Sequence, residues 1–337
     1  MALNFDAKAN AGTDGKSPKG AFFYTVDIGG GKTKRYDQLV LRANAGEWVK
    51  VALTNNVNPK DVGDKQLIAD FSANGQSGDA SYDGIQSYQA SLDAGLTPML
   101  LSYDSRTSSG LNVGFNSVGP QGQKQTAAPG ETVNYTWYAG NISLDKEGNQ
   151  VLTPVEFGGV NLAPPSPLLQ SSYGAYATLA IQPPGSKWDE DHALSTVVRN
   201  SKGEALYTEV VVMGPGSLAQ AQPLTTTVAA GQEVRFRVLN SNASGTAGSA
   251  TNTTNVIAIE GHGWPEEPWQ NASTQIGENL LTQFMGTQQV TPLESYNMVL
   301  ERAGGAETGT QGSYQEYDYY YYPKGPDAKL GTLKVQF

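Results

Sequence analysis

Cysteine is absent from this 337-residue chain, and histidine occurs only twice. Without a thiol the chain forms no disulfide, no thiolate zinc site, no cysteine nucleophile and no blue-copper centre of the usual type, which takes a thiolate ligand. The two histidines stand in unrelated contexts, His192 in an acidic run and His262 at the end of an apolar run. Neither context indicates a Ser-His-Asp triad.

Charge is also scarce, since charged residues make up 16% of the chain and the formal net charge is −10. No stripe of Lys and Arg is present to displace counterions from phosphate, so we expect no nucleic-acid partner. No run approaches the roughly 20 apolar residues of a membrane span. Polar, glycine-containing residues follow Met1, so no signal peptide is visible. We expect either a mature form whose leader has been removed or a cytosolic protein.

Turn-forming and β-forming residues are abundant instead. The chain has 39 Gly, 18 Pro and 17 Tyr, together with many Val and Thr. This composition predicts an all-β chain of short strands, and the clustering of apolar residues into strand-length runs excludes disorder. The length suggests two domains, each able to bury its own core.

The predicted strands are runs that alternate apolar and other residues between turn signals. They are Ala21–Ile28, Gln38–Ala43, Trp48–Thr54, Pro98–Tyr103, Glu131–Ala139, Tyr176–Gln182, Leu206–Met213, Val234–Leu239, Val256–Glu260, Ser295–Leu300, Tyr317–Tyr322 and Gly331–Phe337. The two halves repeat one pattern, because Ala43–Glu47 precedes Trp48–Leu53 much as Ala229–Glu233 precedes Val234–Leu239. We therefore expect two β-sandwiches over residues 21–188 and 189–337, a flexible or extended arm over 1–20, and an insertion over about 55–95 in the first sandwich.

Ten short blocks carry a family resemblance. They are Tyr103–Asn116, Ala128–Glu131, Tyr135–Tyr138, Phe157–Leu162, Tyr173–Trp188, Val234–Leu239, Glu260–Trp264, Glu266–Pro268, Tyr317–Tyr321 and Leu330–Val335. In this order they resemble the cupredoxin domains of bacterial multicopper oxidases, over roughly residues 36–337. The resemblance implies two tandem cupredoxin-like Greek-key β-sandwiches. It also implies an extracellular or cell-surface location, with the periplasm as the alternative.

The resemblance breaks at the copper ligands. Copper chemistry in that family needs about ten imidazoles and one thiolate. The first His pair of the family falls on Thr97–Met99, and the stretch between Asn161 and Gly174 lacks the second. The segment Ile259–His262 keeps one imidazole of two, and Tyr317–Tyr321 holds neither Cys nor His. We therefore predict a degenerate member of the family that holds no copper and has no oxidase activity alone.

The candidate metal ligands are few. His262 and Glu260 lie on the same side of an extended strand and could be a remnant ligand pair, although closed sites take about four ligands. The alternative is that His262 hydrogen-bonds a neighbouring loop. The acidic run Asp189–His192 is either a weak cation site or a solvated charge run. A loosely bound calcium stays open, although the loop aspartates lack EF-hand spacing. These aspartates are Asp27, Asp37, Asp61, Asp64, Asp79 and Asp83.

Aromatic residues near the C-terminus form a candidate binding surface. Alternation puts the odd-numbered tyrosines of the run Tyr317–Tyr322 on one face, which we expect to pack in the core, and Tyr320 and Tyr322 on the other. Trp264 and Trp269 lie in a proline-containing loop that is either a ligand platform or a cap on the end of the sandwich. The candidate surface is thus Trp264, Trp269, Tyr320 and Tyr322.

These observations predict a non-catalytic structural or interaction protein that acts in an assembly at the cell exterior. Self-assembly by strand addition of the 1–20 arm is one specific route. The first alternative is a metal-binding or oxidase accessory subunit that works with a copper-bearing partner. The second is a carbohydrate-binding module that uses the aromatic surface. Five Asn-x-Ser/Thr sequons are either glycosylation sites or chance, and they are Asn134, Asn141, Asn242, Asn252 and Asn271.

Overall fold

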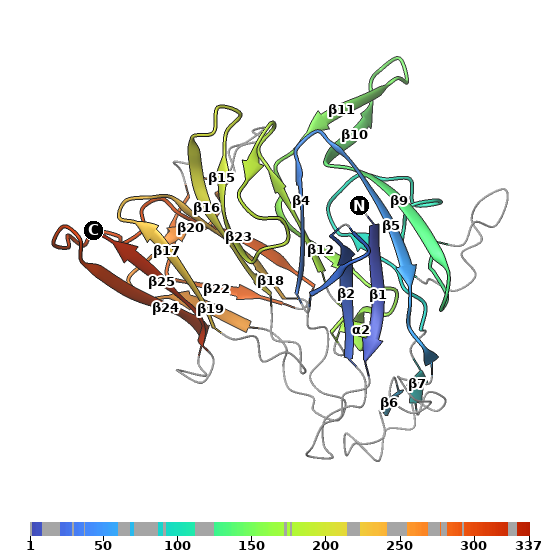
Figure 1. Ribbon diagram of the computed structural model, residues 1–337. Helices are drawn as coiled ribbons and strands as arrows, with labels where there is room; N and C mark the ends of the chain where they lie inside the picture. The colour runs from blue at the N-terminus through green and yellow to red at the C-terminus, as the bar shows by residue number, and fades with distance from the viewer. Residues whose placement is uncertain are drawn as a thin grey trace, which may run out of the picture.

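The structure is a computed structural model. It describes residues 2–8, 21–28, 30–36, 38–59, 68–70, 87–89, 92–111, 125–171, 174–175, 177–213, 223–240, 255–268, 277, 282–291, 293–322 and 329–337. These residues are almost entirely β, and they form two tandem Greek-key sandwiches, which confirms the predicted fold class (Figure 1). In the described part of the chain, no helix is long and apolar enough to cross a membrane.

The first sandwich is built from two sheets. Its strands are β1 (Ala2–Lys8), β2 (Ala21–Asp27), β3 (Thr33–Tyr36), β4 (Leu39–Asn44), β5 (Trp48–Asn55), β8 (Thr97–Pro98), β9 (Thr132–Tyr138), β12 (Gly158–Ala163) and β13 (Ala177–Gln182). The outer sheet has the order β3-β2-β1-β5-β9, and the inner sheet has the order β4-β13-β12-β8. A short helix, α2 (Pro167–Gln170), leads into β13.

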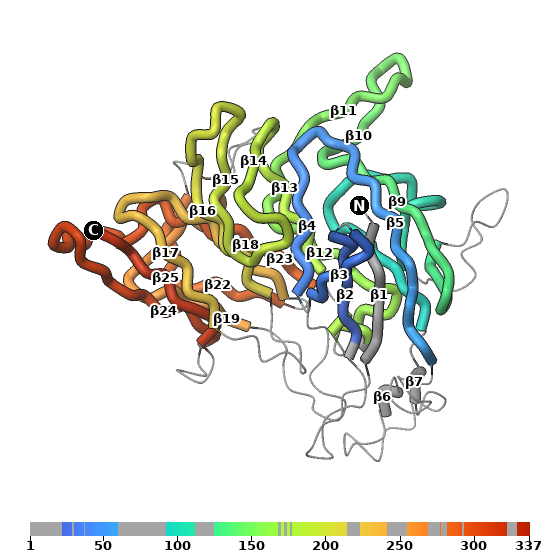
Figure 2. The backbone as a smooth tube through the Cα atoms, viewed as in Figure 1, coloured from blue at the N-terminus to red at the C-terminus, as the bar shows by residue number. Residues whose placement is uncertain are grey.

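Two hairpins lie outside these sheets. One pairs β6 (Ile68–Asp70) with β7 (Ser87–Gln89) inside the predicted insertion. The other pairs β10 (Gly140–Leu144) with β11 (Gln150–Pro154), and it projects clear of both sandwiches (Figures 1 and 2). The sequence reading did not predict the second hairpin.

The second sandwich also has two main sheets. Its strands are β14 (Lys187–Trp188), β15 (Ser195–Arg199), β16 (Ala205–Met213), β17 (Leu224–Ala229), β18 (Val234–Leu239), β19 (Asn255–Ile259), β22 (Thr287–Val290), β23 (Ser295–Leu300), β24 (Tyr314–Tyr322) and β25 (Lys329–Gln336). The inner sheet has the order β14-β15-β16-β18-β23, and the outer sheet has the order β17-β25-β24-β19-β22. A short ladder joins β20 (Trp264–Pro265) to β21 (Phe284–Met285).

The predicted internal repeat corresponds to equivalent strands. β5 runs parallel to β1 and antiparallel to β9, and β18 runs parallel to β16 and antiparallel to β23. Likewise β4 pairs in parallel with β13, as β17 does with β25. The repeated sequence pattern before Trp48 and before Val234 therefore marks one structural position used twice.

Strands lie at both predicted boundaries. Ala2–Lys8 of the predicted arm is extended as β1, and its backbone pairs with β2 and β5 in the position that β16 occupies in the second sandwich. Strand addition to another copy would first require release of β1 from its own sheet. At the predicted boundary of residue 188, β14 pairs with β15 of the second sandwich.

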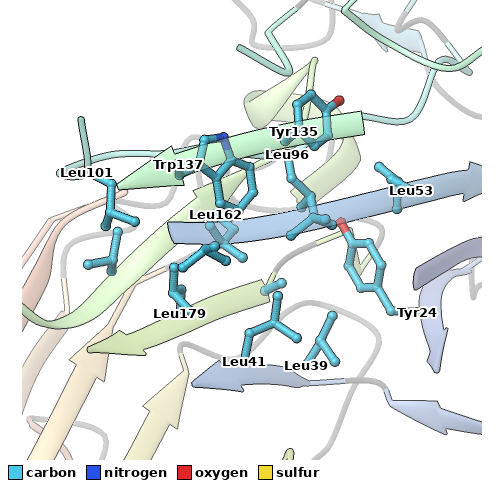
Figure 3. Close-up of a cluster of buried hydrophobic side chains, with 14 of the residues drawn as sticks. Tyr24, Leu39, Leu41, Leu53, Leu96, Leu101, Tyr135, Trp137, Leu162 and Leu179 are labelled. Carbon is cyan, nitrogen blue, oxygen red and sulfur yellow. The ribbon is translucent and has the colours of Figure 1, made fainter. Parts of the chain in front are cut away.

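Each sandwich has its own apolar core. Figure 3 shows part of the first, where Leu41 and Leu179 of the inner sheet face Leu53 and Trp137 of the outer sheet. Trp137 is fully buried and donates its indole N–H to the carbonyl oxygen of Ser108. Alternate residues of one strand thus enter the core, as the period of 2 predicts.

The two inner sheets lie next to each other, so their central strands are buried on both faces. A small apolar cluster between them joins Val40 and Ala180 of the first sandwich to Val211, Met213 and Leu239 of the second. All six residues of β13 and all six of β18 are buried. Around that cluster the interface is polar, and it contains the candidate site.

Candidate functional site

The polar residues of the interface come from strands whose other face is apolar. In β18, the residues Val234, Phe236 and Val238 join the core of the second sandwich, so Arg235 and Arg237 lie on the opposite face. On the surface of a protein this face would meet water. Here it meets the inner sheet of the first sandwich, and the Arg237 side chain is completely buried.

Glu209 of β16 is the centre of the interface. One carboxylate oxygen accepts a hydrogen bond from Arg42 Nε at 3.0 Å, and the other accepts one from Arg237 Nε at 3.2 Å. Gln182 Nε2 donates to the second oxygen as well. Because Arg42 lies on β4 and Gln182 on β13, this one carboxylate binds the two sandwiches together.

A second carboxylate, this one from the first sandwich, binds an arginine of the second sandwich. Glu156, which precedes β12, accepts a hydrogen bond from Arg235 Nη1 at 2.6 Å. Arg235 also pairs with Glu233, and its guanidinium carbon lies 3.9 Å from the centroid of the Tyr207 ring. Tyr207 donates its hydroxyl hydrogen to Gln182 Oε1, which connects this pair to the Glu209 cluster.

The six ionisable side chains would balance in charge if all were ionised. Three arginines face three glutamates, and the whole set is Arg42, Arg235, Arg237, Glu156, Glu209 and Glu233. We call this set, with Gln182, Tyr207 and Asn297, the interface network. A buried ion is stable only when it is paired and its remaining hydrogen-bonding groups are satisfied. The interface network meets that condition for Glu209 and the arginines.

The pKa values of the two central carboxylates are shifted in opposite directions. Burial alone would raise the pKa of Glu209, but Arg42 and Arg237 outweigh it, and the pKa lies below its usual value. Burial raises the pKa of Glu156 to about 7, although Arg235 and Arg237 act to lower it. Glu156 therefore gains and loses its proton near neutral pH, whereas Glu209 stays ionised.

Glycine allows the sheets to approach each other. Asn297 of β23 accepts a hydrogen bond from Gly159 N at 3.0 Å and donates one to the Phe157 carbonyl at 3.0 Å. A Cβ on Gly158, whose φ is +69°, would lie 2.1 Å from Asn297 Oδ1. Asn161 donates to the Leu293 carbonyl across the same seam. The Gly-Gly-x-Asn block noted in the sequence therefore forms a contact between the sandwiches.

His262 and Glu260 do not converge on a common point. His262 Nε2 accepts a hydrogen bond from Gly304 N at 2.9 Å, and Nδ1 donates to the backbone carbonyl of Glu260 at 2.7 Å. The ring meets Tyr317 edge-on, and the Glu260 carboxylate accepts from Asp318 N. Both ring nitrogens are thus occupied by backbone groups. This geometry matches the loop-bonding alternative, and the metal-ligand reading stays a prediction.

The acidic run is held by its neighbours. His192 has a φ of +61° and donates through Nδ1 to the Val40 carbonyl of the first sandwich at 2.7 Å. Asp189 forms an ion pair with Arg199, and Asp191 accepts from Trp188 Nε1. His192 therefore adds a further contact between the sandwiches.

The aromatic surface needs correction at one residue. Trp264 is fully buried in the core of the second sandwich, so it caps the core and is no ligand platform. Trp269 and the side chain of Tyr322 lie outside the described residues, and Tyr320 is half-buried. The odd-numbered tyrosines of Tyr317–Tyr322 are buried at 4%, 1% and 4% exposure, which confirms their predicted face.

The remaining predicted residues are mostly outside the described part of the chain. Asp27 is exposed at the end of β2, whereas Asp37, Asp61, Asp64, Asp79 and Asp83 are not described. The calcium prediction is therefore open. The sequon residues Asn134 and Asn141 are exposed, and Asn242, Asn252 and Asn271 are not described.

Copper, which the fold family implies, does not fit the residues present. The whole chain supplies two imidazoles and no thiolate. At the first family ligand position, Thr97 is buried and its hydroxyl accepts a hydrogen bond from Gly110 N at 2.8 Å. Within the described residues, no group of three or more His, Asp or Glu could hold a metal ion. A multicopper centre needs more imidazoles than the chain contains.

Comparison with known proteins supports the fold and nothing finer. No protein-family model matches the sequence, and no curated protein matches it. The fold is similar to a multicopper oxidase from Pseudomonas thermotolerans at 14% identity and a TM-score of 0.51, covering 100% of this chain and 63% of that one. A crystal structure described as a multicopper oxidase (12% identity, 100% and 88% covered, TM-score 0.49) and the blue copper oxidase from Nitrosomonas europaea (11%, 99% and 84%, 0.46) are also similar.

The chain therefore has a multicopper-oxidase-like cupredoxin fold. The interface network was not predicted from the sequence. A signal was present, because charged residues interrupt the apolar runs of β4 at Arg42, of β16 at Glu209 and of β18 at Arg235 and Arg237. A charge within a strand that otherwise reads as core marks a face that needs a partner.

Proposed function

We propose that this chain is a non-catalytic interaction protein that uses a multicopper-oxidase-like pair of sandwiches as a rigid scaffold outside the cell. The network between the sandwiches supports this proposal. Oxidases of the family build copper sites at domain interfaces, and here the interface holds Arg42, Glu209 and Arg237 in direct contact. Packing such a set leaves the two sandwiches in one fixed arrangement.

The surface provides features suited to binding. The β10–β11 hairpin projects from the first sandwich and exposes Leu144, Val151 and Leu152 at 69%, 40% and 43% (Figure 1). Exposed apolar side chains on a two-stranded hairpin are a surface on which a partner can dock. The exposed sequon residues Asn134 and Asn141 and the net charge of −10 fit an exported protein.

Copper uptake and oxidase activity test the non-catalytic role. The purified chain is incubated with Cu(II), freed of loose metal and analysed for copper content and for oxidation of a phenolic substrate. We expect less than about a tenth of an equivalent of copper and no oxidation above that of free copper. Stoichiometric copper with turnover would overturn the proposal.

A variant distinguishes the accessory-subunit alternative. His262→Ala removes the one imidazole that lies at a family ligand position. If the wild-type chain bound copper and His262→Ala did not, the metal-binding subunit would replace the interaction protein as the better account. Equal copper content in the two proteins, near zero, supports the proposal.

A further inference from the structure

A cavity of about 730 Å³ opens on the first sandwich, away from the interface network. It lies where the start of β5, the segment 101–108, the end of β9 and one side of the β10–β11 hairpin meet. Its volume falls in the range of small-molecule sites. Trp48, Tyr103, Asp104, Arg106, Ile142 and Gln150 are among the residues that line it.

An exposed tryptophan lines this cavity. Trp48 is 48% exposed, whereas Trp137 and Trp264 are fully buried. Its ring packs against Tyr138 with centroids 5.1 Å apart and planes at 50°, so Tyr138 supports the ring while the side chain stays exposed beside the cavity. Leaving so large an apolar ring in water costs free energy that a ligand can recover. An aromatic face of this kind attracts the C–H bonds of a sugar ring, because those hydrogens carry partial positive charge.

The polar groups of the cavity suit a neutral ligand. Arg106 donates through Nε and Nη2 to the two oxygens of Asp104, at 3.0 and 2.8 Å. The pair is exposed and its charges cancel, so the cavity attracts neither anions nor cations strongly. Asp104 keeps acceptor capacity and Arg106 keeps N–H donors. With the exposed amide of Gln150, they offer donors and acceptors to hydroxyl groups.

The wall of the cavity is fixed before any ligand arrives. Ser102 accepts hydrogen bonds from Tyr138 N at 2.8 Å and from Ile142 N at 3.1 Å. Ser108 accepts them from Thr136 N at 3.2 Å and from Trp137 Nε1 at 2.9 Å. These bonds attach the segment 101–108 to β9 and β10. A preformed wall reduces the ordering cost of binding.

We propose that this cavity binds a neutral saccharide, with Trp48 as the stacking platform and Asp104, Arg106 and Gln150 as partners for its hydroxyl groups. The site differs from the aromatic surface around Trp264. It rests on the proposed interaction role, because it gives that role a class of ligand. A copper-free chain that binds no sugar would refute the saccharide site and leave the non-catalytic role in place.

Native affinity electrophoresis tests the site. The full chain is run through gels that contain laminarin, xylan, galactomannan or, as an anionic comparison, alginate. We expect one of the neutral polysaccharides to retard the chain, and Trp48→Ala to weaken the association about tenfold or more. Phe284→Ala is the matched control, since Phe284 is an aromatic side chain of the second sandwich with 66% exposure, and it should leave retardation unchanged.

Two further variants make the result decisive. Trp48→Tyr keeps an aromatic platform and should retain most of the binding, which separates loss of stacking from loss of fold. Asp104→Asn should weaken binding less than Trp48→Ala. Retardation by none of the neutral polysaccharides, retardation by alginate alone, or an equal loss in Phe284→Ala would overturn the proposal.

Discussion

The interior of each sandwich and the interface between the sandwiches are both buried, but they are built from opposite chemistry. The core of the first sandwich is apolar around Leu41, Leu179 and Trp137 (Figure 3). The interface holds three arginines and three glutamates. Apolar contacts are non-directional and lose stability gradually when a side chain shrinks. A buried ion network is intact only when every member has its partner.

The difference implies that the interface is the more sensitive region to single changes. Removing one ion leaves an opposite charge buried and unpaired, whereas removing one methyl group leaves a small cavity. The predictions below start with the largest expected effect.

Loss of Glu209 should be the most damaging change at the interface. Glu209→Ala leaves Arg42 and Arg237 buried without their common partner. We expect the free energy of unfolding to fall by about 3–5 kcal/mol, measured by urea denaturation. Asp189→Ala, which breaks the exposed pair with Arg199, is the control and should cost about 1 kcal/mol or less. Similar losses in both variants would contradict the special role of the buried network.

Close approach of the sheets predicts a second strong effect at Gly158. Gly158→Ala puts a methyl group into Asn297, while Gly203→Ala places one in open space at a comparable positive φ of +88°. Both positions have a positive φ that strains an alanine, so the control removes most of the backbone effect from the comparison. We expect Gly158→Ala to lose about 1–3 kcal/mol more than Gly203→Ala in the same urea assay. Equal losses would show that the sheets separate there without cost.

The raised pKa of Glu156 predicts a pH effect. Between pH 4.5, its ordinary pKa, and about 7 the folded chain holds a proton that the unfolded chain releases. The contribution of Glu156 to the free energy of unfolding is therefore full below pH 4.5, and it is lost as the pH rises to about 7. The lowered pKa of Glu209 acts only at more acidic pH. Glu156→Gln should match wild type near pH 4.5 and be more stable by about 1–3 kcal/mol at pH 8.

Urea denaturation at several pH values measures this difference. The charged groups that face Glu156 are Arg235, Arg237, Glu233 and Glu209. If they held Glu156 ionised throughout, the gap between the two proteins would not change with pH, and the assignment would be wrong.

The smallest effect is expected at the end of the second sandwich. His262→Ala removes the acceptor of Gly304 N and should cost about 1 kcal/mol. His262→Asn, which can restore an acceptor, should recover part of the loss. Thermal unfolding in the presence and absence of Cu(II) measures both variants. A copper-dependent rise in the midpoint for wild type alone would favour the metal reading of this residue instead.

The sequence predicted several strands from clear alternation, but it missed others, among them β15 and β17, whose burial also alternates. β5, β9 and β18 were found because large apolar residues recur at every second position. β12 was not among the predicted strands, and glycine is depleted in strands, although Gly158 and Gly159 permit contact between the sheets here. The predicted strand Pro98–Tyr103 overlaps β8 (Thr97–Pro98) only at Pro98, and Ser102 forms an isolated bridge with Tyr138 of β9.

The interface network could not be predicted from the sequence, and the reason is physical. Arg42 and Glu209 are 167 residues apart, and no local rule connects them. Alternating Arg and apolar residues in Val234–Leu239 predict one buried and one solvated face. Only the position of the other sandwich makes the second face buried. The candidate residues that the sequence did identify, His262 and Glu260, were chosen from the family motif, and the sequence did not reveal that Gly304 N and Asp318 N are their hydrogen-bond donors.

Hydrogen exchange on the Glu209→Ala variant tests most directly the claim that the interface network joins the two sandwiches. The account predicts that amides of β4, β13, β16 and β18 lose protection by about a hundredfold or more, while those of the outer strands β9 and β24 lose much less. An equal loss in all these strands, or no loss at the inner sheets, would contradict the claim.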